Sequence, residues 1–338
     1  MSKVQLLWGL AKVLMPEGLA APFVRRAVVD GRQIDVSAQA ASDLVQLVRD
    51  PNVVLTVTES RAQLEQLTAR FDQPRPTSVT TRDMTMPTGR KARLYTAPGG
   101  AVDAPLLLFL HGGGWIQGSL STHDGLCGRL CEMSGFRVLS YDYPLAPEQR
   151  FPAAPDDILS LYRALVAGTT EVAVDPARLV VGGDSAGGNL TAVLMSDLVA
   201  ANDPLPAAQV MLYPAVDGRL TSRSMEALAD QPLLPRLRID RFLSDYLPEG
   251  HSRSDPRFSP LFSDHLAGQP PAFILHGGHD PLWDDGTAYA EALRAAGVTV
   301  TLSPWPGQVH GFMSIAKAIP QATAATREVA DWMKEHVG

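Results

Sequence analysis

The sequence predicts an α/β fold in which a mainly parallel β-sheet is covered by helices on both faces. From about residue 105 onward, short apolar runs recur, and helical stretches such as residues 158–165 lie between most of them. Strands that alternate with helices favour a parallel sheet with right-handed crossover connections. The chain has 338 residues, of which 45% are hydrophobic and 19% are charged, so it can bury a core of this size.

Residues 1–73 precede this alternation and are predicted to be mainly helical. Ser60 and Gln63 resemble a capping box, and apolar residues follow them at helical spacing. The proline-rich residues 73–76 then interrupt the pattern. We therefore expect an N-terminal helical cap segment over residues 1–73 and the main α/β domain over residues 74–338.

Eight segments of the main domain are predicted strands. Residues 77–86 and 91–95 flank a Pro-Thr-Gly-Arg turn and form the first pair. Residues 106–110 are a continuous apolar run, which is typical of a strand covered on both faces. Similar short runs occupy residues 137–141, 179–181, 210–213, 272–275 and 298–302.

Residues 217–255 break the alternation of strands and helices. This stretch is rich in Pro, Arg and Asp, with a short helical piece near residues 239–246. We expect it to be an insertion that lies above the sheet and forms a cap together with the N-terminal helices.

The composition bears on partners and location. The net charge of -7 argues against a nucleic-acid partner and suits a protein that handles neutral or weakly charged small molecules. No apolar run reaches the roughly 18 residues of a membrane span, so we expect no stable membrane insertion. The apolar residues 4–15 lack the flanks of a signal peptide, which favours a packed or interfacial amphipathic helix and a cytoplasmic protein.

The two cysteines raise the question of a metal site. Cys127 and Cys131 lie four residues apart in a helix-like stretch, and His123 precedes them by one turn. As ligands these three would leave a zinc site incomplete, because structural zinc takes four ligands and no second Cys/His cluster is evident. We expect two buried thiols on a helix face, and neither metal nor cofactor.

The pentapeptide Gly183-Asp184-Ser185-Ala186-Gly187 matches the pattern G-x-S-x-G. It follows the strand predicted at residues 179–181 and precedes a helical stretch, which is the strand–elbow–helix context that exposes a nucleophilic serine. Glycines suit such an elbow because crowded neighbours leave no room for a Cβ atom. The pattern alone fits an ordinary glycine-rich turn equally well.

A second glycine-rich motif, His111-Gly112-Gly113-Gly114-Trp115, directly follows the strand predicted at residues 106–110. Glycines let backbone N–H groups point at a tetrahedral intermediate, and loops of this type supply oxyanion donors together with the residue after the nucleophile. The predicted donors are Gly113, Gly114 and Ala186. We expect Asp184 to be a hydrogen-bonded structural carboxylate and His111 to hold its own loop.

A nucleophilic serine needs a base, and the base needs an orienting carboxylate. In the order Ser, acid, His, only His310 lies in a loop after a late predicted strand. His276 and His279 precede the best acid, and His336 lies in a helical stretch near the C-terminus. We therefore predict His310 as the base.

The best acid is Asp280, which follows the strand predicted at residues 272–275. The ends of parallel strands are where such a sheet displays functional side chains. Asp284 and Asp285 remain close rivals for the role.

Taken together, these motifs make the sequence resemble the hormone-sensitive-lipase-like esterases, bacterial lipase family IV, of the α/β-hydrolase superfamily. The resemblance covers about residues 77–338 and implies Ser185 as nucleophile, Asp280 as acid and His310 as base. It departs from the family at Pro144, where the family usually has Arg. The matching segments, in family order, are residues 111–115, 142–148, 151–154, 183–189, 280–284 and 310–312.

The expected activity is that of a serine carboxylesterase that hydrolyses short- to medium-chain acyl esters through an acyl-enzyme. An amidase or deacylase, or a membrane-associated lipase with the same triad, remains an alternative. A non-catalytic binding protein on this fold is disfavoured because the triad is complete. The expected partner is a small-molecule acyl ester, and the resemblance also implies a homodimer.

Overall fold

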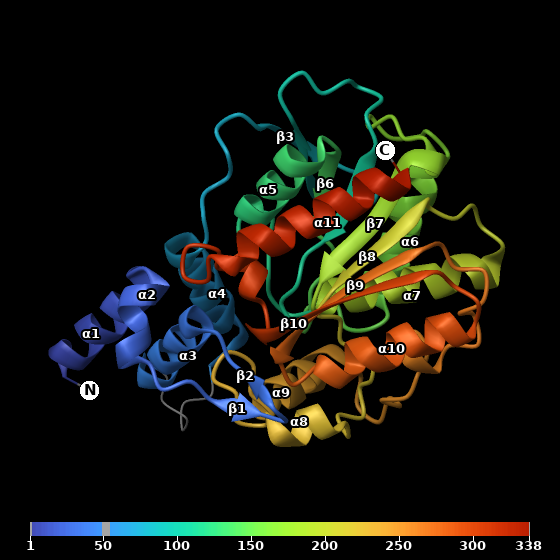
Figure 1. Cartoon of the computed structure of the whole chain (residues 1–338). Helices are drawn as coiled ribbons and strands as arrows, with labels where there is room; N and C mark the ends of the chain where they lie inside the picture. The colour runs from blue at the N-terminus through green and yellow to red at the C-terminus, as the bar shows by residue number, and fades with distance from the viewer. Residues whose placement is uncertain (1, 49–54, 338) are drawn as a thin grey trace.

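One eight-stranded sheet forms the centre of the computed structural model, which describes residues 2–48 and 55–337 (Figure 1). The strands lie in the order β10-β9-β8-β7-β5-β6-β4-β3. β4 is antiparallel to both of its neighbours, and the other pairs are parallel. Their bounds are β3 Thr80–Thr85, β4 Lys91–Thr96, β5 Leu106–Leu110, β6 Arg137–Tyr141, β7 Leu179–Asp184, β8 Ala208–Leu212, β9 Ala272–His279 and β10 Val300–Val309.

The predicted α/β fold and its mainly parallel sheet are confirmed, but three strands run further than predicted. β7 continues to Asp184, β9 to His279 and β10 to Val309. The extensions of β7 and β9 contain glycines, which add no apolar side chain to the pattern, so these extensions were not predicted. A Cβ atom on Gly182 would lie 2.9 Å from the Val210 carbonyl oxygen, and one on Gly278 would lie 2.2 Å from the Pro306 carbonyl oxygen.

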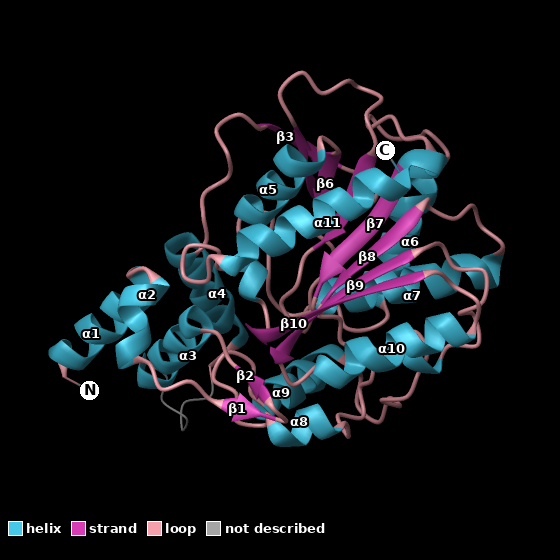
Figure 2. Cartoon of the chain, in the orientation of Figure 1, coloured by secondary structure: helices cyan, strands magenta, loops and turns pink. Residues whose placement is uncertain are grey.

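Helices cover both faces of the sheet (Figure 2). α5 (Asp124–Ser134) and α11 (Gln321–Val337) pack on the face that includes Leu107 and Phe109 of β5. α6 (Ala153–Val166) and α7 (Ala186–Ala201) pack on the opposite face with Leu106, Leu108 and Leu110, and α10 (Trp283–Ala295) covers Ile274 of β9. This alternation along β5 is what a strand buried on both faces requires.

The N-terminal segment is mainly helical, as predicted. Its helices are α1 (Lys3–Leu14), α2 (Glu17–Ala20), α3 (Val36–Val48) and α4 (Val57–Phe71), and residues 49–54 of the predicted cap segment lie outside the described residues.

Two details of that segment differ from the prediction. The capping box of α4 is formed by Thr56 and Glu59, so the expected box at Ser60 was wrong by one turn. A small antiparallel hairpin, β1 (Val28–Val29) and β2 (Arg32–Gln33), was not predicted because each strand has only two residues.

The stretch 217–255 carries two helices, α8 (Arg223–Ala227) and α9 (Arg236–Tyr246). Two adjacent carboxylates at the start of α10 accept hydrogen bonds from the backbone at the beginning of this stretch. Asp285 accepts hydrogen bonds from the backbone N–H groups of Val216 and Asp217, and Asp284 accepts one from Ser224. The assignment of this stretch and of residues 1–73 as caps stays a prediction. None of the helices in the described residues combines the length and the apolar character that crossing a bilayer requires.

Candidate active site

Three strand ends bring the predicted triad together. β7, β9 and β10 each end one residue before Ser185, Asp280 and His310, respectively. The Nε2 atom of His310 lies 2.9 Å from the Ser185 Oγ, and its Nδ1 atom lies 2.7 Å from the Asp280 Oδ2. Because the three strands are parallel, their carboxyl ends meet at one edge of the sheet, and side chains 125 residues apart become neighbours.

Ser185 occupies a strained backbone conformation. Its φ is +55° and its ψ is -116°, which non-glycine residues rarely adopt. A Cβ atom on Gly183 would lie 2.3 Å from the Leu110 carbonyl oxygen, and one on Gly187 only 1.8 Å from it. The predicted need for glycines at this elbow is therefore confirmed: any side chain there would push α7 away from β5.

The glycine loop after β5 contains N–H groups that make no hydrogen bond. Gly113 and Gly114 have φ values of +127° and +59°. A Cβ atom on Gly114 would lie 2.1 Å from the ring of Phe242, so α9 packs directly over this loop. Within the described part of the chain, the N–H groups of Gly113, Gly114 and Ala186 donate to no acceptor. The N–H of Ala186 is free because it begins α7.

A buried ion pair between Asp184 and His123 fixes the start of the glycine loop. The Asp184 Oδ1 accepts the Gly112 N–H at 2.7 Å and lies 3.1 Å from the His123 Nε2. Burial by itself raises the pKa of Asp184, but His123 and the Gly112 N–H outweigh it and lower that pKa below its usual value. Burial opposes the charged form of His123, yet Asp184 raises the pKa of His123. The expected structural role of Asp184 is confirmed.

His111 turns back on its own loop, as predicted. Its Nδ1 lies 2.9 Å from the Gly112 carbonyl oxygen, and its own carbonyl oxygen accepts the Tyr143 hydroxyl at 2.7 Å. Burial lowers the pKa of His111 to about 4, so its ring is neutral near pH 7. It has no contact with Ser185 that would allow proton transfer.

Side chains of α4 also bind the residues that directly follow the glycine loop. Arg61 donates to the carbonyl oxygens of Ile116 and Ala146 and pairs with Glu148, and Ser60 donates to the buried Gln117 side chain at 2.6 Å. Sequence reasoning missed these contacts because the partners lie 55 to 87 residues from α4.

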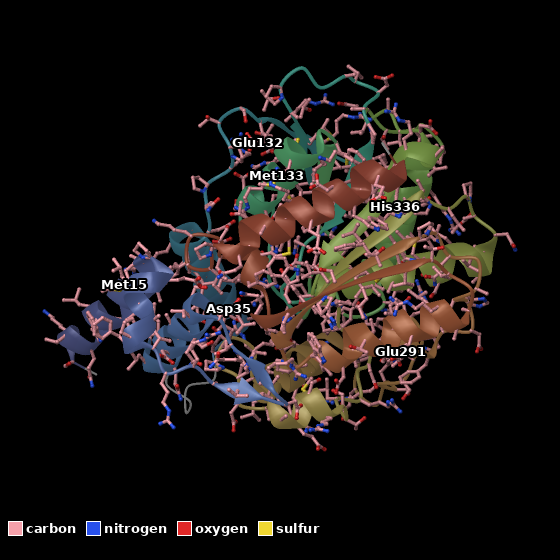
Figure 3. The ribbon with its side chains drawn as sticks, in the orientation of Figure 1. Met15, Asp35, Glu132, Met133, Glu291 and His336 are labelled. Atoms are coloured by element: carbon pink, nitrogen blue, oxygen red, sulfur yellow. The ribbon has the colours of Figure 1, made fainter. Side chains whose placement is uncertain are left out.

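The hairpin β1–β2 is a second missed contact. The Arg32 side chain donates to the Gly278 carbonyl oxygen at 2.9 Å, and its backbone oxygen lies 3.0 Å from the His279 Nε2. Asp35, labelled in Figure 3, follows the hairpin, and its N–H donates to the Gly307 carbonyl oxygen at 2.8 Å. The hairpin thus braces the ends of β9 and β10, from which Asp280 and His310 project.

The rival acids do not reach the base. Asp284 and Asp285 instead bind the backbone of residues 216–224, whereas the fully buried Asp280 holds the Leu282 N–H with its second oxygen at 2.9 Å. The remaining candidate histidines are engaged elsewhere. His276 stacks on Trp283, His279 lies against Arg32, and the His336 Nδ1 lies 2.9 Å from the Trp332 carbonyl oxygen.

The buried Asp285 gives stability a testable pH dependence. Burial raises its pKa to about 8. The unfolded chain loses this proton near pH 4, whereas the folded chain keeps it to about pH 8, so folding stability falls as the pH rises between these values. Asp285→Asn keeps an oxygen for Val216 and Asp217, and we expect it to lessen that fall by about 3.6 kcal/mol between pH 5 and pH 8. Urea unfolding at both pH values measures this, and an unchanged difference would contradict it.

The predicted thiols are buried, and the hydrogen-bonding partner of His123 is another residue. Cys127 and Cys131 are free cysteines in the core, and burial raises the pKa of both thiols. His123 instead pairs with Asp184. Across residues 2–48 and 55–337, no group of three or more His, Cys, Asp or Glu side chains is arranged to hold a metal ion.

Comparisons with known proteins agree with this architecture. Residues 107–314 match the family model described as alpha/beta hydrolase fold. The chain is 35% identical to a carboxylic ester hydrolase, LipN, of Mycobacterium tuberculosis, over 93% of this chain and 86% of that protein. It is 37% identical to an ethyl acetate hydrolase of Pseudomonas putida, over 85% of this chain and 92% of that protein.

The structural comparison gives the same result. A crystal structure of an esterase from the bacterial hormone-sensitive lipase family superposes with a TM-score of 0.81 at 31% identity, covering 89% of this chain and 98% of the other. The chain therefore belongs to the α/β-hydrolase fold family and, within it, to the hormone-sensitive-lipase-like group.

Proposed function

We propose that the chain is a serine carboxylesterase that hydrolyses short- to medium-chain acyl esters through an acyl-enzyme. The observation that carries this proposal is the hydrogen-bonded series from Ser185 through His310 to Asp280. Relatives named carboxylic ester hydrolase and ethyl acetate hydrolase support it.

In the proposed reaction, the Ser185 Oγ attacks the ester carbonyl carbon while the His310 Nε2 takes the hydroxyl proton. The N–H groups of Gly113, Gly114 and Ala186 stabilise the oxyanion of the tetrahedral intermediate. His310 then gives the proton to the leaving alcohol, and Asp280 stabilises the transient imidazolium. Water cleaves the acyl-enzyme by the same route and releases the acid.

A panel of p-nitrophenyl esters from C2 to C16 tests the activity, and matched anilides separate an esterase from an amidase. No hydrolysis of any ester in the panel would overturn the proposal. The cytoplasmic location and the homodimer stay predictions, and analytical ultracentrifugation tests the second.

We expect the rate to peak at acyl chains of roughly C4 to C8 and to fall beyond them. Each methylene gains about 0.8 kcal/mol, about fourfold in rate, only while an apolar wall remains to receive it. Phe242 packs against Gly114 in the glycine loop, and we expect its ring to limit the space next to the reacting carbonyl. Turnover that climbs steadily to C16 and jumps on lipid emulsions would favour the membrane-associated lipase instead.

Replacing Phe242 tests the bounded space directly. Phe242→Ala should raise the C12 to C4 rate ratio severalfold, since it removes the ring that lies against Gly114. Leu237→Ala is the matched control, because Leu237 lies on the same helix and is 79% exposed. Equal ratios in the native protein and in Phe242→Ala would contradict the role of Phe242.

A further inference from the structure

The N-terminal helix α1 is apolar on two faces, and only one of them is covered. Its inner face packs on α3, where Leu6, Leu10 and Val13 join the main apolar cluster. A Cβ atom on Gly9 would lie 3.2 Å from the Leu44 side chain, so the two helices are in close contact. A helix that is apolar all round is normally buried all round. We therefore expect the exposed outer face of α1 to bind another apolar surface.

The outer face continues onto the residues that follow α1. Val4, Leu7 and Trp8 recur at helical spacing and are 75%, 66% and 46% exposed. The Trp8 ring meets the Phe23 ring edge to face at 5.3 Å, which joins α1 to the turn at residues 21–23. Met15, which ends α1, is labelled in Figure 3 at this outlying end of the molecule. The N-terminal apolar patch consists of Val4, Leu7, Trp8, Leu14, Leu19 and Phe23, all of them exposed.

Positive charge flanks this patch on a chain that is acidic as a whole. Residues 1–26 contain four cationic side chains, of which Lys12 and Arg26 pair with Asp43 and Asp35, whereas the whole chain has a net charge of -7. The other two cations, Lys3 and Arg25, are exposed and directly precede and closely follow the patch residues in the sequence. The single acid among residues 1–26, Glu17, accepts hydrogen bonds from Ser37 and Gln321 on its inner side.

We propose that the N-terminal apolar patch docks the protein reversibly on the surface of an anionic lipid bilayer. Exposed Leu and Val side chains would enter the boundary between headgroups and acyl chains, Trp8 would lie at the headgroup level, and Lys3 and Arg25 would meet anionic lipids. A second copy of the chain fits less well, because the patch has no acidic side chain to oppose the cations of its partner. Docking sets where the protein acts and leaves its chemistry unchanged.

Cosedimentation of the full chain with vesicles tests the proposal. The protein should bind vesicles of phosphatidylcholine with 30% phosphatidylglycerol and release them in part at 0.5 M salt. Leu7→Gln/Trp8→Gln should weaken binding at least tenfold. Lys3→Gln/Arg25→Gln should weaken it about 25-fold on anionic vesicles, because each cation contributes about fivefold, and should change little on pure phosphatidylcholine.

The matched control replaces two exposed apolar residues outside the patch. Val102 and Leu237 are 80% and 79% exposed, so Val102→Gln/Leu237→Gln should bind vesicles like the native protein. Hydrolysis of a water-soluble ester by each variant shows that the fold is intact. Native protein that fails to sediment with anionic vesicles would overturn the proposal. So would a dimer that Leu7→Gln/Trp8→Gln dissociates, because the patch would then bind a second copy.

Discussion

Ser185→Ala is expected to lower the turnover of p-nitrophenyl butyrate by on the order of 10⁴- to 10⁶-fold. The Ser185 Oγ lies 2.9 Å from the His310 Nε2, and the N–H groups of Gly113, Gly114 and Ala186 are the proposed oxyanion donors. Removing one oxygen atom takes away the proposed nucleophile and leaves those donors in place. The residual rate should therefore come from direct attack of water on an ester whose carbonyl oxygen these N–H groups stabilise.

The variant should fold as well as the native protein. The positive φ of Ser185 costs alanine about as much as serine, because both have a Cβ atom, and the hydrogen bond from the Ser185 N–H to Leu212 is a backbone contact. Ser160→Ala, on the exposed face of α6, is the matched control and should keep full activity. A fluorescent alkylphosphonate should label the native protein and the control but not Ser185→Ala. More than a tenth of native activity in Ser185→Ala would contradict its role as nucleophile.

The strands were predictable where apolar side chains run without a break. β5 and β6 match their predicted bounds because every residue in them is buried. The second half of β10 was not predictable in this way, since Pro304, Pro306 and Gly307 lie within it. These residues usually end a strand, yet β10 continues to Val309 through a register shift against β9.

The core of the site was predictable because its signals are local. Each triad residue follows a strand, and the two glycine motifs mark places where backbones approach closely. The residues that hold the site in place have no local signal in the sequence. Arg61 and Arg32 look like ordinary surface charges in the sequence, and only the fold shows that they bind carbonyl oxygens 55 and 246 residues away. In the sequence His123 lies one helical turn before two cysteines, but its partner in the fold is Asp184, the residue before Ser185.

Asp280→Asn is expected to lower turnover by on the order of 10⁴-fold with little loss of stability. The Asp280 Oδ2 accepts the His310 Nδ1–H at 2.7 Å, which leaves Nε2 free to take the Ser185 proton. An asparagine keeps the Leu282 N–H bound through its oxygen and turns its NH2 group toward His310. Nδ1 must then accept, so the ring proton moves to Nε2 and the base is blocked.

Asp284→Asn and Asp285→Asn are the matched controls for this change, and both should retain activity within about threefold of native. Each keeps an oxygen for the backbone N–H groups of residues 216–224, and neither touches His310. A comparable loss in Asp284→Asn would show that the wrong carboxylate was assigned. A loss in all three that follows unfolding, measured by thermal melts, would mean that this acidic loop supports the fold and does not orient the base. With the fold intact, a selective loss in Asp280→Asn assigns the tautomer control to that side chain, because the three substitutions are chemically the same and differ only in what each oxygen binds.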